Sequence, residues 1–173
     1  SRKGLYHISD HFLEFWFRFV YPYKSELELD NRRPVLDRLN RHFIDNHVSF
    51  IYEDICRDLL EQMIVREQID FSLSKSGSYW NGSTQIDVMA IDAEGSRVIA
   101  GECKYHEAPV GMEVYVDLQE KCARVPELGN LEVSYIIFSK SGFTRHMLET
   151  AKGNERLQLV NEDRLVFTNP PIQ

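Results

Sequence analysis

Two apolar runs joined by a short turn constrain the fold of this chain more than any other feature of its sequence. The runs are Gln85–Asp92 and Arg97–Tyr105, and the residues between them, 93–96, read Ala-Glu-Gly-Ser. Loops of about four residues are common in β-hairpins, so the two runs are predicted to pair as antiparallel strands. Apolar residues fill both alternating sets of positions in the runs, which predicts strands that are covered on both faces.

Three ionisable side chains interrupt these runs. Asp87 lies in the first run, while Glu102 and Lys104 lie two positions apart in the second, so that these two project from one face. If Asp92 pairs with Arg97, the register places Asp87 directly opposite Glu102, where like charges destabilise a sheet. A divalent cation would turn that repulsion into attraction, and carboxylate oxygens suit Mg²⁺ or Mn²⁺.

Strand alternation also predicts the neighbours of Asp87. Met89 and Ile91 would share its face, and the opposite face would be filled by apolar residues, namely Ile86, Val88 and Ala90. The three charged residues could instead face solvent on a two-stranded ribbon, with Lys104 simply paired to Glu102. Because charges set among apolar residues are often functional, we favour a site.

Composition limits the possible partners and the compartment. The chain is 43% hydrophobic and carries a net charge of −7, so it should form a core but lacks a global basic surface for nucleic acid. Its three cysteines show no C-x-x-C spacing and are interpreted as buried thiols in a reducing cytoplasm. The sequence contains no apolar run of about 18 residues, so it predicts no membrane span. A chain that starts at Ser1 rather than Met is expected to be a fragment.

A helix before the hairpin supplies a further candidate carboxylate. Apolar residues recur every four positions between His47 and Met63, which predicts a helix with one buried stripe. Glu53 lies at the border of that stripe and could reach a neighbouring sheet, although an exposed helix glutamate is an equal alternative.

The rest of the chain gives further expected elements. Residues 71–73 are predicted as a short strand, 75–78 as a loop and 79–80 as the start of another strand. After the hairpin come a helix over 111–125 and a buried strand over 133–138. The last expected elements are a helix over 143–152 and short strands over 157–160 and 164–167.

The first part of the chain is predicted to be separate. The aromatic run from Phe12 to Val20 predicts a short helix that is apolar nearly all round, and therefore buried or docked. Residues 21–34 are polar and mixed, as in a linker, and a second helix is predicted over 35–46. We therefore divide the chain into an N-terminal helical extension or linker, residues 1–46, and an α/β domain, residues 47–173.

This order of elements resembles the PD-(D/E)XK nuclease superfamily. The shared features are the α-β-β-β-α-β order, an aspartate on one strand and Glu-x-Lys on the next. The resemblance implies a restriction-endonuclease-like fold, in which helices flank a mixed central sheet. It also implies that Asp87, Glu102 and the carbonyl of Cys103 hold Mg²⁺ or Mn²⁺, that Lys104 positions the attacking water, and that Glu53 completes the catalytic and metal site.

A closer resemblance covers most of the chain. The segments that carry it are Tyr6–Val20, Ile51–Leu60, QIDVMA, GECKY and Phe138–Phe143. Together they resemble the domain of unknown function at the C-terminal end of archaeal-type AAA ATPases of archaea and bacteria. In such proteins a P-loop ATPase module and a winged helix come first. This chain has no G-x-x-x-x-G-K-[ST] motif, so it would be the C-terminal domain alone.

Two departures from the superfamily pattern stand out. Ile86 occupies the position of the proline in Pro-Asp, and Ala123 replaces the tyrosine of a Gln-x-x-x-Tyr element that begins at Gln119. Lys121 lies on the same predicted helix and is interpreted as a solvated side chain.

Two functions follow as expectations. The first is a nuclease-like domain that hydrolyses phosphodiester bonds of nucleic acid with Mg²⁺ or Mn²⁺. The alternative is a noncatalytic docking or nucleic-acid-binding module of the same ATPase. The sequence does not distinguish DNA from RNA.

Overall fold

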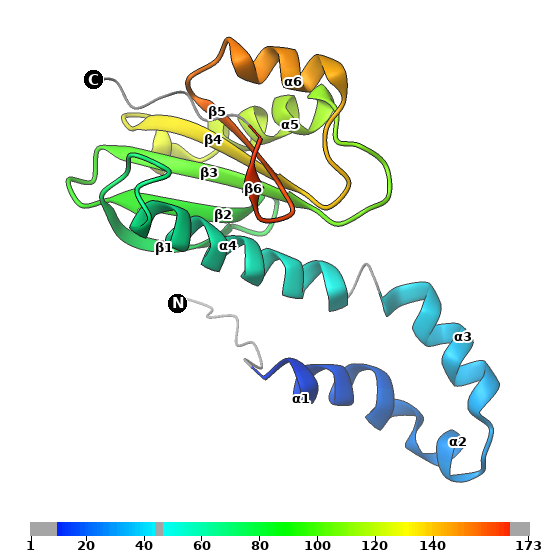
Figure 1. The fold of residues 1–173 in the computed structure, drawn as a ribbon. Coiled ribbons are helices and arrows are strands. Elements are labelled where there is room, and N and C mark those ends of the chain that lie inside the picture. The colour runs from blue at the N-terminus through cyan, green and yellow to red at the C-terminus, as the bar shows by residue number, and fades with distance from the viewer. Residues whose placement is uncertain (1–9, 44–46, 167–173) are drawn as a thin grey trace. The chain divides into compact units, whose positions relative to one another are not determined.

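The computed structural model describes residues 10–43 and 47–166, with no side-chain description for residues 41 and 42. It divides into two compact units, Ser1–Ile51 and Tyr52–Gln173. The larger unit holds the sheet, and the smaller unit is helical (Figure 1). The division of the chain between residues 46 and 47 stays a prediction.

The larger unit contains a six-stranded sheet in which spatial order follows chain order. The strands are β1 Leu73–Trp80, β2 Gln85–Asp92, β3 Arg97–Lys104, β4 Glu132–Ser139, β5 Leu157–Asn161 and β6 Arg164–Leu165. The pairs β1–β2, β2–β3 and β5–β6 are antiparallel. The pairs β3–β4 and β4–β5 are parallel, so the sheet is mixed.

Helices cover both faces of this sheet. Helix α4, Ser49–Val65, lies on one face, and helices α5, Met112–Ala123, and α6, Arg145–Lys152, lie on the other (Figure 1). Each face has its own apolar core. Leu60 and Met63 of α4 belong to the first core, and Leu118 of α5 and Met147 of α6 belong to the second. The predicted fold class, a mixed central sheet flanked by helices, is confirmed.

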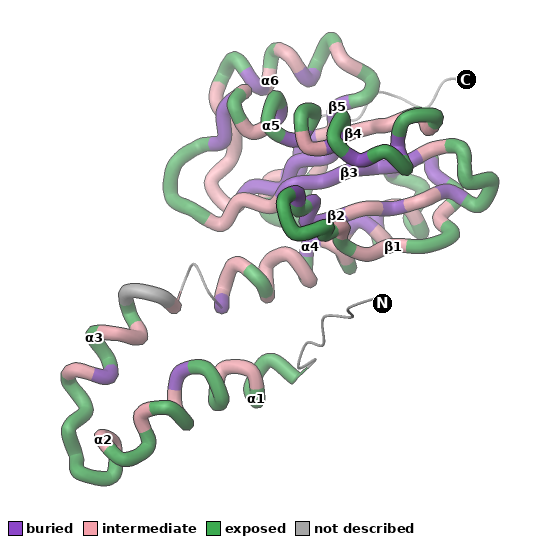
Figure 2. The backbone as a smooth tube through the Cα atoms, turned by 180° about the vertical axis from the view of Figure 1, so that it is seen from behind, coloured by how far each residue is buried: buried purple, intermediate pink, exposed green. Residues whose placement is uncertain are grey.

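The middle of the sheet is the most buried part of the unit. Figure 2 shows buried residues running along β3 and its neighbours. Ile136 and Ile137 of β4 point to opposite cores, and both are fully buried. The sequence-based prediction of a strand at 133–138 is therefore confirmed, and its second half, 136–138, is fully buried, because only a strand covered on both faces keeps consecutive apolar residues out of water.

Strand β1 differs from its prediction. Residues 75–78 were expected to form a loop, yet Lys75, Ser76 and Gly77 pair with Ile91, Ala90 and Met89 of β2. The loop expectation was wrong because pairing with a strongly apolar neighbour overrides the weak strand preference of these residues. Their polarity suits an edge strand, whose outer side faces solvent.

The predicted β2–β3 hairpin forms with its predicted register. The ladder pairs Val88 with Gly101 and Ile91 with Val98, and the two pairs between them follow the same register. At the turn, the Asp92 carboxylate accepts the backbone N–H groups of Ser96 and Arg97 at 2.8 and 2.9 Å. The N–H of Arg97 is the main reason why the pKa of Asp92 is lowered despite burial.

A bulge in β2 changes the faces of the residues beside Asp87. Gly77 pairs with Met89, but Tyr79 pairs with Ile86. The segment of β2 between these two pairs is therefore one residue longer than the segment of β1 that it faces. Ile86 consequently packs in the core on the α5 side, whereas Val88 packs in the core on the α4 side. The expectation that Ile86 and Val88 share a face was wrong, because the extra residue reverses the alternation.

The smaller unit is helical throughout most of its described length. Its elements are α1 His11–Phe15, a π-helical turn Trp16–Val20, a 3₁₀ turn Tyr21–Tyr23, α2 Lys24–Glu28 and α3 Arg32–Phe43. Residues 21–34 were expected to be a linker, and the structure corrects this because much of that stretch is helical. The predicted end of the second helix, at residues 44–46, lies outside the described residues.

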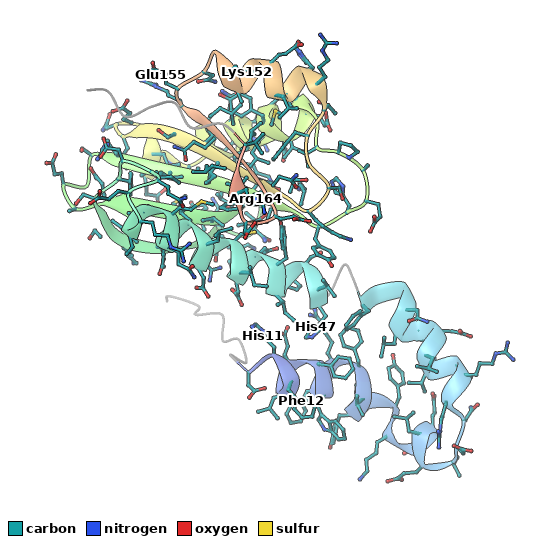
Figure 3. All side chains as sticks on the ribbon, viewed as in Figure 1. His11, Phe12, His47, Lys152, Glu155 and Arg164 are labelled. Carbon is teal, nitrogen blue, oxygen red and sulfur yellow. The ribbon has the colours of Figure 1, made fainter. Side chains whose placement is uncertain are left out.

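Aromatic rings form the interior of the smaller unit. The rings of Phe15, Phe19, Phe43 and His47 pack together, with centroids of neighbouring pairs between 5.5 and 6.0 Å apart. Figure 3 labels His47 of this group and Phe12 of the aromatic run. The opposite side of the aromatic run is exposed, and Phe12 is 67% accessible. The expectation that this segment would be buried or docked is therefore met on one side within the unit, and docking of the exposed side stays a prediction.

Two further sequence expectations concern cysteines and membranes. Cys56, Cys103 and Cys122 are all free; Cys56 and Cys122 are buried and Cys103 is half-buried. Within residues 10–43 and 47–166, no helix is long and apolar enough to cross a membrane.

Gly101 offers a test of how tightly the sheet is packed beside the site. A Cβ at this position would lie 2.8 Å from Cγ2 of Ile136 and 3.1 Å from Cβ of Val88. We predict that Gly101→Ala lowers the free energy of unfolding by about 1–3 kcal/mol, measured by urea denaturation. Gly77→Ala is the matched control, because a Cβ there meets nothing within 4 Å. Equal losses in both variants would contradict this account of the packing.

Candidate active site

The candidate site lies where β2 begins and β3 ends, beyond the last ladder pair, Val88 with Gly101. Here the backbone N–H of Cys103 donates to Oδ2 of Asp87 at 3.0 Å. A side-chain carboxylate thus accepts an N–H group that a regular ladder would direct to a backbone carbonyl. The carboxyl end of β3 is also the end of an α/β sheet at which ligands commonly bind.

Asp87 and Glu102 are buried carboxylates at this point. Asp87 is 6% exposed and Glu102 is 4% exposed. Burial raises the pKa of Asp87, and the charge of Glu102 raises it further. The N–H of Cys103 and the ammonium groups of Lys104 and Lys121 oppose this shift without cancelling it. Asp87 is therefore held in surroundings that penalise its negative charge.

Glu53 approaches the same carboxylates from α4. Burial raises the pKa of Glu53 to about 8, and the negative charges of Asp87, Asp54 and Glu102 add to the shift. Glu53 is half-buried rather than freely exposed on the helix. The helix and the hairpin therefore bring three carboxyl groups into electrostatic contact.

Two lysines bind the Glu102 carboxylate. Nζ of Lys104 lies 2.8 Å from Oε1, and Nζ of Lys121 lies 2.9 Å from both Oε1 and Oε2. Lys121 also contacts Oδ2 of Asp117 at 3.0 Å, on the same helix. Burial alone would lower the pKa of Lys121, but its bonds to Glu102 and Asp117 outweigh that effect and the pKa is raised.

Lys121 is the site residue that sequence reasoning misassigned. It was interpreted as solvated, whereas its side chain is 20% exposed and reaches the buried Glu102. A signal was present, because Lys121 directly precedes the buried Cys122 and follows the buried Leu118 on α5. A position at the border of a buried stripe is the same signal that selected Glu53.

A second buried carboxylate on β2 shows that these shifts are local. Asp92, at the other end of the strand, is fully engaged by N–H donors and its pKa is lowered. Asp87 and Glu53 have raised pKa values in the same domain. Burial acts to raise the pKa of all three acids, but hydrogen bonds outweigh it only at Asp92, so the uncompensated pair Asp87 and Glu53 marks a functional-site candidate.

The donors at this site suit a hard divalent cation. The carboxylates of Asp87 and Glu102 offer oxygen, and Glu53 adds another carboxyl nearby. Burial raises the pKa of the Cys103 thiol well above its usual range, so the backbone carbonyl is the donor which this residue offers. A cation would offset both the burial of charge and the repulsion between carboxylates that raise the pKa of Glu53 and Asp87.

The metal-binding arrangement is nevertheless incomplete in one respect. Among the residues that the structure describes, no three His, Cys, Asp or Glu side chains are gathered closely enough to bind a metal ion by themselves. Carbonyl oxygens and water commonly complete the shell of Mg²⁺. The donor chemistry therefore fits, while the charge of Glu102 is at present balanced by two ammonium groups.

The raised pKa of Glu53 predicts a pH-dependent stability. Its folded value, about 8, exceeds its ordinary value of 4.5, so between these values the unfolded chain releases the proton that the folded chain retains, and the free energy of unfolding falls as pH rises. We predict that Glu53→Gln, which cannot ionise, becomes more stable relative to the wild type between pH 5 and pH 8. Urea denaturation at both pH values measures this difference.

Asp58→Asn is the matched control for this measurement. Asp58 is an exposed carboxylate on the same helix, and its replacement should give no comparable dependence on pH. A Glu53→Gln difference that stays constant from pH 5 to pH 8 would contradict the assignment of Glu53 to the carboxylate cluster.

Comparison with known proteins adds a family match. A family model described as "Archaea bacterial proteins of unknown function" (DUF234) matches residues 16–122. An uncharacterized protein of Methanocaldococcus jannaschii, MJECL04, is 24% identical over 145 residues, which cover 81% of this chain and 31% of that protein. The chain thus spans about a third of the length of this curated relative.

Two solved structures show weak similarity. A repair endonuclease from Pyrococcus abyssi matches with a TM-score of 0.40 and 13% identity, over 60% of this chain and 44% of that chain. The EndoMS–dsDNA complex matches with a TM-score of 0.31 and 12% identity, over 66% of this chain and 44% of that chain. Neither similarity is high enough to assign a reaction to this chain.

Proposed function

This chain belongs to the DUF234 family of archaeal and bacterial proteins of unknown function, and because membership names no reaction, we propose from the site itself that it is a metal-dependent phosphodiesterase domain acting on nucleic acid. One observation carries the proposal. The negative charges of Asp87 and Glu102 act on Glu53 near the carboxyl end of β3, and Lys104 contacts Glu102. Three carboxylates beside a lysine match the needs of phosphodiester hydrolysis.

Each residue has a distinct role in this proposal. Asp87, Glu102 and the Cys103 carbonyl would hold Mg²⁺ or Mn²⁺, with Glu53 available to a second cation or to a water of the first. The cation would polarise the scissile phosphate and lower the pKa of a water. Lys104 would orient the attacking water and stabilise the negative charge that develops on the phosphate.

The proposed substrate is nucleic acid, and its contact surface is local. The net charge of −7 argues against a broad basic face. Positive charge is instead available at the site itself, from Lys104. The resemblance to PD-(D/E)XK nucleases supports this substrate class, and DNA and RNA remain alternatives for the assay.

We also propose that the domain works within a longer protein. The resemblance to the C-terminal domain of AAA ATPases supports a preceding P-loop module and winged helix as its partners. The relative from M. jannaschii supports this reading, because the matched region covers only 31% of its length. Such an ATPase and the three free thiols fit the cytoplasm.

A noncatalytic module of the same ATPase is the second candidate function. It is favoured by the exposed aromatic side chains of the smaller unit, Phe12, Phe17 and Tyr21, which could dock on a partner or a base. Titration with Mn²⁺ discriminates between the two functions. Absence of binding at millimolar Mn²⁺, together with tight binding to the ATPase module, would favour the noncatalytic candidate.

The catalytic proposal predicts the effect of removing Lys104. With Mg²⁺ or Mn²⁺ present, we expect Lys104→Ala to slow cleavage of single- and double-stranded DNA and RNA by about 10²-fold or more, since a group that stabilises transition-state charge is lost. Lys75→Ala is the control, because Lys75 is an exposed lysine on β1. Cleavage by Lys104→Ala at the wild-type rate would refute the role given to Lys104.

A further inference from the structure

All three donor positions of the Lys121 ammonium are in use. Two of its bonds reach the two oxygens of Glu102 at 2.9 Å each, and the third reaches Asp117 at 3.0 Å. An ammonium group has three N–H donors and no acceptor. Lys121 therefore has no donor left for a phosphate or a water while it remains in this position.

The position of Lys121 on Glu102 is the one that matters for a cation. The ammonium lies at equal distances from both carboxylate oxygens, which is how a cation bound by a bidentate carboxylate would lie. The Glu102 side chain is only 5% exposed, so solvent offers its charge little compensation. Without a positive charge at this point, a buried carboxylate beside Asp87 would be strongly destabilising.

We propose that Lys121 is an internal counterion of the metal site: it neutralises Glu102 when no divalent cation is bound, and a cation must displace it from Glu102. This inference rests on the proposed function, because it assumes that the site binds a cation. Lys121 is thus a positioning residue, since it acts through Glu102. It sets the cation affinity of the site lower than the carboxylates alone would give.

The structure also provides a partner for the displaced ammonium. Asp117 is already bonded to Lys121, and the Asp117 side chain is 56% exposed. The flexible four-carbon stem of a lysine allows Nζ to turn away from Glu102 while it keeps this second bond. Repulsion between a divalent cation and an ammonium at close range would drive that movement.

Lys104 does not duplicate this arrangement. It makes one bond, to Oε1 of Glu102, and its side chain is 30% exposed. A cation that takes the place of Lys121 can leave Lys104 beside the site, as the proposed catalytic role requires. Cation binding therefore displaces Lys121 from Glu102 but allows Lys104 to stay beside the site.

Calorimetric titration of the 173-residue chain with Mn²⁺ tests the inference. We expect Lys121→Met and Lys121→Gln to bind Mn²⁺ about tenfold more tightly than the wild type or better, because a competing positive charge is removed. Arg124→Met is the matched control: it removes the same charge from the end of α5, at an exposed pair with Glu120. Its affinity should stay within about twofold of the wild type, because exposed charges are screened.

Thermal denaturation supplies a readout that does not depend on activity. Without metal, both Lys121 variants should melt below the wild type, because Glu102 loses a partner. Added Mn²⁺ should then raise their melting temperatures by more than it raises that of the wild type, since stabilisation by a ligand grows with the logarithm of its concentration divided by Kd. Lys121→Gln keeps a hydrogen-bond donor at the site. It therefore allows the same measurements if Lys121→Met does not fold.

The outcomes separate the two proposals. Wild type that binds Mn²⁺, with Lys121 variants that bind no more tightly, overturns the counterion role and leaves the proposed function standing. A chain in which neither the wild type nor any variant binds Mn²⁺ overturns both. Tighter binding in both Lys121 variants but not in Arg124→Met supports the inference.

Discussion

The hydrogen bond from the Cys103 N–H to the Asp87 carboxylate determines how the sheet and the site are related. It falls just beyond the last pair of β2 with β3, so the strand end is closed by a side chain instead of a carbonyl. A buried N–H group must find an acceptor, and here that need fixes the orientation of an acid. The charge of the neighbouring Glu102 carboxylate acts on Asp87 at the same point. Fold stability and site geometry thus share one bond.

The acids of this domain show three ways of keeping a buried carboxyl group. Asp92 keeps its charge through backbone N–H donors, which lower its pKa. Glu102 is balanced by ammonium groups, and Glu53 is held protonated at neutral pH by burial and by its acidic neighbours. Only the last two solutions are reversible by a cation, because an ammonium can be displaced and a proton released. The acids at the end of β3 can therefore exchange an ammonium or a proton for a cation, whereas Asp92 stabilises a turn.

The sequence predicted what depends on local pattern and failed where distant strands and helices decide. The β2–β3 register followed from the turn and the alternation of residues 85–105, and the structure confirms it. The face of Ile86 did not follow, because the bulge is set by pairing with β1, whose polar centre reads as a loop. Lys121 was misread for a similar reason: its partner, Glu102, lies on a strand, and a helical pattern does not show what a border residue meets. Glu53 lies at such a border too, and for the same reason its sequence position left an exposed helix glutamate as an equal alternative.

Glu102 accepts two bonds from Lys121 and one from Lys104, and this difference suggests separate roles for the two lysines. Lys121 comes from a helix, is bonded three times and compensates Glu102 from across the core. Lys104 comes from the same strand as Glu102, is bonded once and is more exposed. A side chain that gives up one bond loses less on turning toward a substrate than a side chain that gives up two. Compensation of the buried charge and readiness for chemistry are thus assigned to different residues, and removal of either lysine should disturb the site in a different way.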